Sequence, residues 1–211
     1  YNILAHNFAA GIGGGITHKE FIGNPKKDRH TNPELALIEN LKAQLISANI
    51  DVETGEFTLV VYNKSFEKGE LLRMALKYPQ HAFFLTMLNA QVVDLLDFFV
   101  QGYWYQENFH GRVSLKVTQP ALIHSQYAEA IYGDRLHHIL ETLDYKQGLI
   151  QNGAVALDVY QSLLRKVLLH QPLDDQHDAL IDALLAYCKI DSWGTVVLYD
   201  IIVQVVQRNG A

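Results

Sequence analysis

The stretch from residue 57 to residue 71 constrains the fold most, because it predicts a strand that runs directly into a helix. Residues 57–62 (Phe-Thr-Leu-Val-Val-Tyr) form a continuous β-branched and aromatic run, which is typical of a buried strand. The run stops at Asn63, and from Ser65 onward apolar residues recur at helical spacing. The carboxyl end of a buried strand is where α/β proteins commonly place functional polar groups. Asn63 and Glu67 are therefore candidate site residues.

The same junction also has a purely structural interpretation. Ser65 is a good N-cap residue, and Glu67 in the first turn would interact favourably with the helix dipole. On these residues alone the structural interpretation is favoured. The choice between the two depends on a second feature far along the chain.

Composition limits the class of protein. The chain has 211 residues, of which 49% are hydrophobic and 19% charged, so we expect one domain spanning residues 1–211 with a sizeable core. The net charge of -6 excludes adhesion to nucleic acid through overall charge, but not a local basic groove or metal-mediated binding. The single cysteine, Cys188, excludes an intrachain disulfide and predicts a reducing compartment, the cytoplasm. No apolar run reaches the roughly 18 residues of a membrane span.

Further elements are predicted on both sides of the junction. Two strands, residues 2–8 and 15–22, are expected to pair through a glycine-rich connection, and a helix capped by Asn32 follows them. Other predicted elements are a short strand ending at Asp94, a helix or extended segment at residues 112–120, and helices at residues 82–90, 154–169, 178–189 and 194–208. This order predicts a single α/β layer domain. Asp94 either lies near the site or accepts backbone amides at its strand end.

The second feature is the pair Tyr187 and Asp191. These residues are four apart in a predicted helix, so both project from one face of it. A carboxylate there can bind a divalent cation, and a phenol one turn away can orient a water that attacks a phosphate held by the cation. Tyr-x-x-x-Asp is a weak pattern alone, but it becomes moderately specific together with Asn63 and Glu67.

The two motifs together resemble the second and third motifs of DnaQ-like 3′–5′ exonucleases, the DEDD group, in its tyrosine subclass. The second motif here is Asn63-Lys-Ser-Phe-Glu67, with Glu where the group has Asp, and the third is Tyr187-Cys-Lys-Ile-Asp191. More narrowly, the chain looks like a bacterial uncharacterised family within that group, at residues 61–67, 93–95, 113–116, 120, 152–153 and 185–191. That family's domain often follows a restriction-like nuclease domain, which implies a larger polypeptide.

The resemblance implies a ribonuclease H-like mixed sheet flanked by helices. It also implies hydrolysis of DNA or RNA phosphodiesters at an end of the strand by two Mg²⁺ or Mn²⁺ ions about 3.5–4 Å apart. Glu67 and Asp191 would be metal ligands, and Tyr187 would position the attacking water. Asn63 would position the site or the substrate. Lys116, one of several basic residues near the motifs, could meet substrate phosphates, although a solvated face would have the same pattern.

One motif of the group departs from the expected pattern. The Asp-x-Glu of the group's first strand is missing, and the only Asp-x-Glu here, Asp51-Val-Glu53, falls in a predicted turn. In the resembled fold that first strand is central and pairs with the next strand and with the residue 57–62 strand. We therefore expect the chain to lack this strand, with two of four carboxylates upstream of Tyr1. The alternatives are a catalytically degenerate nuclease fold that serves as a binding or structural module, and an unrelated α/β interaction domain.

Overall fold

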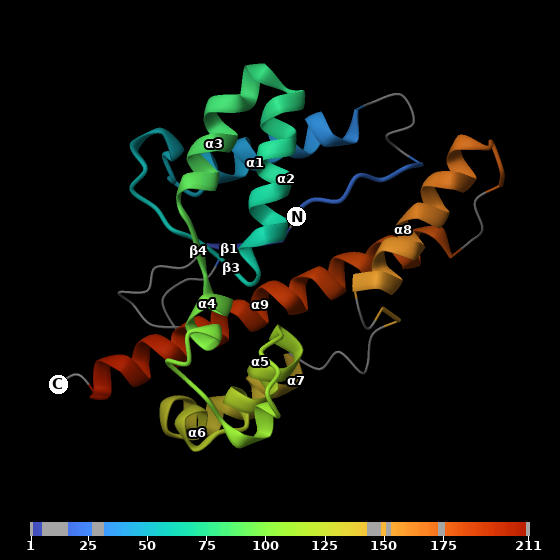
Figure 1. Ribbon diagram of the computed structural model, residues 1–211. Coiled ribbons are helices and arrows are strands. Elements are labelled where there is room, and N and C mark those ends of the chain that lie inside the picture. The colour runs from blue at the N-terminus through green and yellow to red at the C-terminus, as the bar shows by residue number, and fades with distance from the viewer. Residues whose placement is uncertain are drawn as a thin grey trace.

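The protein is a mixed α/β domain made mostly of helices (Figure 1). The computed structural model describes residues 2–5, 17–26, 32–142, 149–150, 153–172 and 176–209, so the glycine-rich connection at residues 9–15 lies outside the described residues. The strands are β1 (Asn2–Ala5), β2 (Thr17–Glu20), β3 (Leu59–Val61) and β4 (Val92–Asp94). The helices are α1 (Pro33–Ser47), α2 (Lys64–Lys77), α3 (Ala82–Ala90), α4 (Leu95–Val100), α5 (Leu115–Ile123), α6 (Gln126–Tyr132), α7 (Leu136–Thr142), α8 (Gly153–Leu168) and α9 (His177–Asn209).

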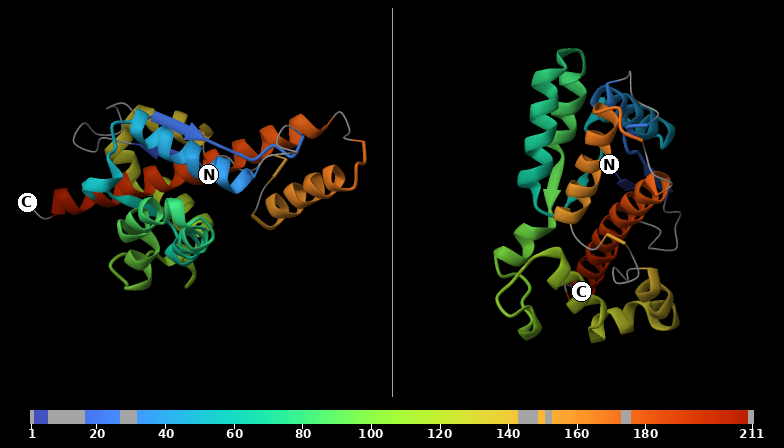
Figure 2. Two further views of the ribbon diagram at one scale, coloured as in Figure 1. Left: turned by 90° about the horizontal axis from the view of Figure 1, so that it is seen from above. Right: turned by 90° about the vertical axis from the view of Figure 1, so that its right-hand side faces the viewer.

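The strands form two separate pairs. β1 and β2 are antiparallel, with Asn2 opposite Glu20, which confirms the predicted pairing of the first two strands. β3 and β4 are parallel, with Val61 opposite Asp94. Within the described residues no ladder joins the two pairs. In the right-hand view of Figure 2, β1 lies on the α9 side of the molecule and β4 on the side of α2 and α3.

The first hydrophobic core belongs to α1, α2 and α3, and it includes the buried side chains Ile38, Leu71, Phe84 and Leu85. As predicted, α1 begins with proline at its first position, after Asn32, whose side chain accepts a hydrogen bond from the Leu35 N–H at 3.3 Å.

Ion pairs reinforce this lobe at the end of α2. The Glu34 carboxylate in the first turn of α1 pairs with Arg73 and Lys77 of α2. It also accepts a hydrogen bond from the Tyr78 hydroxyl at 3.0 Å. These contacts fix the amino end of α1 against the carboxyl end of α2.

Two further cores lie along α9. One gathers Phe99, Phe109 and Leu122 against Val197 and Ile201 of α9. The other gathers residues of α8 against the first turns of α9, with Leu163, Ile181, Leu184 and Tyr187 among its buried members. In the described part of the chain, no helix is both long and apolar enough to cross a membrane.

A buried hydrogen-bond network ties α6 to α9 within the larger of these cores. The Tyr132 hydroxyl donates to Asp200 Oδ2 at 2.8 Å, and Gln204 Nε2 donates to the same oxygen at 2.9 Å. Burial and the neighbouring carboxylate raise the pKa of Tyr132, so this hydroxyl stays a donor.

Two predicted boundaries are wrong. The helices predicted at residues 178–189 and 194–208 are one continuous helix, α9. Gly194 does not interrupt it, and a Cβ there would stand 3.5 Å from the Gln119 side chain of α5, which is ordinary van der Waals contact. Ser65 is not the N-cap of α2, because the helix begins at Lys64 and Asn63 precedes it in the left-handed region with φ of 77°.

Candidate functional site

The carboxylate of Asp94 holds the junction between β3 and α2. Its Oδ1 accepts hydrogen bonds from the Asn63 N–H at 2.8 Å and the Leu96 N–H at 2.9 Å, and its Oδ2 accepts one from the Lys64 N–H at 2.8 Å. Asp94 is only 8% exposed and ends β4, the parallel neighbour of β3. It therefore satisfies the first amides of α2 in place of the predicted Ser65 cap, which supports its interpretation as an amide acceptor.

Glu67 lies one turn into α2, next to this anchor. Its side chain is half-buried, and its Oε2 is buried without a hydrogen-bond partner. Burial raises the pKa of Glu67 above its ordinary value, and the charge of Asp94 raises it further. An unpaired buried carboxylate oxygen is costly, so this position favours either a proton or a bound cation.

The other predicted residues at the junction differ in their environments. Asn63 is exposed, and its side chain makes no capping hydrogen bond, so the amide is available at the surface. Phe66 is 69% exposed. Two basic neighbours are engaged in the local structure: Lys64 pairs with Asp97 and Lys68 donates to the Asn89 carbonyl at 3.1 Å.

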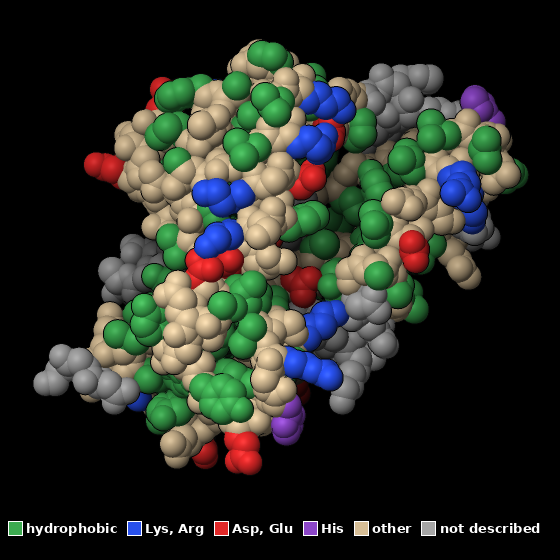
Figure 3. Space-filling model, in the orientation of Figure 1, with side chains coloured by type: hydrophobic (Ala, Val, Ile, Leu, Met, Phe, Trp, Pro, Cys, Tyr) green, Lys and Arg blue, Asp and Glu red, His purple; other side chains and the backbone are tan. Residues whose placement is uncertain are grey.

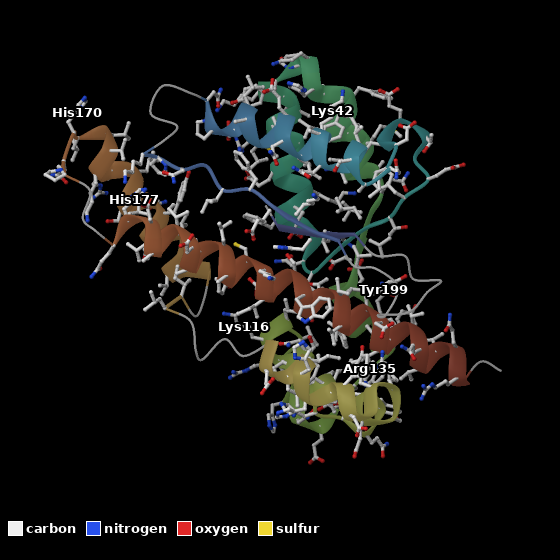
Figure 4. The ribbon with its side chains drawn as sticks, turned by 180° about the vertical axis from the view of Figure 1, so that it is seen from behind. Lys42, Lys116, Arg135, His170, His177 and Tyr199 are labelled. Atoms are coloured by element: carbon white, nitrogen blue, oxygen red, sulfur yellow. The ribbon has the colours of Figure 1, made fainter. Side chains whose placement is uncertain are left out.

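The predicted helix motif forms a second group of side chains around Tyr187. Tyr187 is 8% exposed. Burial raises the pKa of Tyr187 most, and the charge of Asp191 and its hydrogen bond to the phenol raise it further. Lys116 Nζ of α5 lies 5.4 Å from the centre of the Tyr187 ring, and Figure 4 shows Lys116 between α5 and α9. The structure thus brings Tyr187, Asp191 and Lys116 together.

The first turn of α8 covers the Tyr187 hydroxyl. A Cβ built at Gly153 would stand 3.9 Å from that oxygen, which leaves room for a small residue at this position. Cys188, the next residue of α9, is partly buried, and burial raises the pKa of its thiol. A nucleophilic role for Cys188 has no support from this environment.

Tyr62 connects the two groups. It immediately precedes Asn63, and its hydroxyl contacts the Val113 carbonyl and the Thr118 hydroxyl, the latter at 2.9 Å. Burial raises the pKa of Tyr62 to about 12. The end of β3 is thereby fixed to α5, the helix that carries Lys116 over Tyr187.

The two groups themselves are held by different parts of the framework. α2, with Glu67, packs mainly against α3, whereas α9, with Asp191, packs against β1, α5, α6 and α8. In the space-filling view, acidic and basic side chains lie between the α2–α3 lobe and the lower helices (Figure 3). Across the described residues, no three or more His, Cys, Asp or Glu side chains gather as a metal-ion site. The donors at both motifs are carboxylate oxygens, the type that suits Mg²⁺ or Mn²⁺.

One polar residue next to this site was missed in the sequence. Gln119 is 3% exposed, and its Oε1 is buried without a hydrogen-bond partner. Its side chain faces α9, where a Cβ built at Gly194 would stand 3.5 Å from it. The available signal was its position three residues after Lys116, which places both on one face of a helix.

Comparisons with known proteins give one match. No curated protein and no solved structure matches the chain. A family model described as a domain of unknown function (DUF2779) matches residues 6–114, just over half of the 211 residues. The matched segment includes Asn63, Glu67 and Asp94 and ends before α5. The chain therefore belongs to the DUF2779 family.

Proposed function

We propose that this domain takes part in metal-dependent 3′–5′ exonucleolytic hydrolysis of DNA or RNA on a ribonuclease H-like sheet. The observation that carries the proposal is the buried, unpartnered Oε2 of Glu67 at the carboxyl end of β3. A cation at this oxygen would remove the cost of burying it unpaired. The resemblance of residues 63–67 to the second DnaQ-like motif also implies that Glu67 binds a metal ion.

The strand pairs support the ribonuclease H-like part of the proposal. β1 pairs with β2, and β3 pairs with β4. Within the described residues, the other edge of β1 and the other edge of β3 have no strand beside them. The resemblance puts a central strand between the equivalents of β1 and β3. We propose that this strand carries the Asp-x-Glu motif and that it completes the sheet in a larger polypeptide.

The residues of this chain take distinct roles in the proposed reaction. Glu67 and Asp191 would hold Mg²⁺ or Mn²⁺, which supplies charge stabilisation at the phosphate and lowers the pKa of a bound water. Asn63, exposed at the junction, would contact the substrate, and Lys116 would meet a phosphate. The raised pKa of Tyr187 keeps its phenol neutral, so the hydroxyl would orient the attacking water as a hydrogen-bonding group and not as a base.

A second candidate function is nucleic-acid binding by a catalytically degenerate nuclease fold. The charge of Asp94 raises the pKa of Glu67. The Asp94 carboxylate accepts hydrogen bonds from three backbone N–H groups, so it already has a structural role. Metal ligation by Asp94 would break charge-assisted hydrogen bonds that begin α2. In this alternative the domain binds DNA or RNA but does not cleave it.

The decisive experiment uses the polypeptide that contains the completing strand. Asp191→Asn should abolish Mn²⁺-dependent release of nucleotides from the 3′ end of a 5′-labelled single strand, and Tyr187→Phe should slow it less. Asp178→Asn, on the same helix but exposed, is the matched control and should retain full activity. Hydrolysis that survives Asp191→Asn would contradict the assignment. Binding of the single strand without any hydrolysis would favour the second candidate.

A further inference from the structure

Helix α8 has two apolar faces, of which only one is packed. Val159 and Leu163 face the core formed with Ile181 and Leu184 of α9. On another face, Leu157, Leu164 and Leu168 are 56%, 37% and 68% exposed. Single exposed leucines are common on protein surfaces, but three leucines aligned along one face of a helix form an apolar patch that can contact a partner.

The spacing of this patch is that of a helix–helix seam. Leu157, Gln161, Leu164 and Leu168 follow one another at intervals of four, three and four residues, as core positions do in a coiled coil. We call these four residues the leucine seam. Gln161, also exposed, is the only polar member of the seam.

We propose that the leucine seam pairs with the same seam of a second copy of this chain, with the two α8 helices antiparallel. The pairing is isologous and closes on a dimer, because the same residues are used by both copies. In this register Leu157 meets Leu168 of the second copy, and Gln161 meets Leu164 of the second copy. The exposed face of α8 is therefore covered by α8 of the second copy.

Charge complementarity supports both the partner and the direction. Asp158 and Arg165 are exposed, lie one heptad apart, and flank the seam on the same side. Antiparallel pairing sets Asp158 of each copy against Arg165 of the other, which gives two opposite-charge contacts per dimer. A parallel pair would set Asp158 against Gly153 and Arg165 against Tyr160, and neither of these positions carries a charge.

The position of α8 in the molecule allows this approach. The helix lies at one edge of the molecule in Figures 1 and 2. Figure 3 shows hydrophobic side chains on its outer side, with acidic and basic side chains among them. A pair of helices of 16 residues makes a small interface, so we expect a dissociation constant on the order of 10 μM.

The mass of the chain in solution tests the seam. Sedimentation of the 211-residue chain from about 1 to about 200 μM should show a shift from 23.9 kDa towards twice that mass. Leu164→Glu and Leu168→Glu should each keep the chain at 23.9 kDa throughout. The matched control is Leu76→Glu, an 84% exposed leucine on α2, which should dimerise like the unchanged chain.

Charge reversal tests the direction. Asp158→Arg or Arg165→Asp alone should weaken dimerisation roughly tenfold, because each creates two like-charge contacts. The double variant should restore it to within about twofold, with circular dichroism unchanged in all variants. A chain that stays at 23.9 kDa at every concentration overturns the proposal, as does a dimer that survives both glutamate variants. If the double variant dimerises no more tightly than the two single variants, the antiparallel register is wrong.

Discussion

The ammonium nitrogen of Lys116 lies 5.4 Å from the centre of the Tyr187 ring. This contact sets a cation from α5 beside the α9 face that bears Asp191, so a cation and a carboxylate both lie next to one phenol. A phosphate entering here would meet the ammonium, whereas a metal ion would meet the carboxylate. The predictions that follow concern this group, the β3–α2 junction and the ion pairs of the first lobe.

Lys116→Gln should weaken the binding of an oligothymidylate and reduce the slope of log K against log[salt] by about 1. The physical reason is the loss of one counterion-releasing phosphate contact. Fluorescence anisotropy at several salt concentrations measures both quantities. Lys42 offers a matched control, because it also lies over an aromatic ring, 5.8 Å from the centre of Phe84, in the other lobe (Figure 4). An equal effect of Lys42→Gln would show that the contact at Lys116 is not specific.

Asp94→Asn should destabilise the fold by about 2–3 kcal/mol, because the carboxylate accepts three backbone amides and an asparagine cannot accept them all. Urea unfolding followed by circular dichroism gives the free energy. Asp97→Asn is the control: Asp97 pairs with Lys64 but is 45% exposed, so its loss should cost no more than about 0.5 kcal/mol. Equal losses in the two variants would argue against the anchoring role of Asp94.

Glu67→Gln should raise the melting temperature at pH 7.5 by about 1–3 °C and change it little at pH 4. The folded-state pKa of Glu67 is raised above 4.5, so the native state holds this proton more tightly than the unfolded state. Stability from this group is complete below pH 4.5 and is lost as the pH rises through the folded pKa. Scanning calorimetry at the two pH values measures the change. If Mn²⁺ binds here, it should raise the melting temperature of the unchanged chain but not that of the variant.

Glu34→Gln should have the opposite pH dependence. The Lys77 hydrogen bond lowers the pKa of Glu34 from 4.5 to about 2, with Arg73 and Tyr78 contributing. The stabilisation, about 1–2 kcal/mol, is therefore present above pH 4.5 and is lost as the pH falls towards 2. Denaturant titrations of both proteins should converge at low pH. Glu39→Gln, an exposed change on the same helix, should leave stability unchanged throughout.

Local signals predicted those parts of the fold that depend on neighbouring residues. Asn32 followed by proline predicted the start of α1, and the residue 57–62 run predicted β3, which the structure shortens to Leu59–Val61. The intervals in the Tyr187 motif placed its phenol beside the Asp191 carboxylate, because four residues of a helix bring two side chains onto one face.

Contacts between distant residues decided the rest, and no local pattern encodes them. Ser65 is a good cap by propensity, as is Asn63, but Asp94 reaches the first amides of α2 from another strand. The valine-rich end of α9 favours a strand by propensity, yet Val197 and Ile201 are fully buried on one face of a helix. Gly194 weakens a helix by about 1 kcal/mol relative to alanine, but α9 continues through it because the residues on both sides are packed in the cores.

The long helix α9 has a consequence for how the molecule opens. It contributes buried residues to the α8 core and to the α5–α6 core, so unfolding of α9 would remove packing from both cores at once. The described members of the α1–α2–α3 core all lie between residues 35 and 92, and α9 supplies none of them. Native-state amide exchange should therefore divide the molecule into two cooperative units, with the α9 amides in one and the α1–α3 amides in the other.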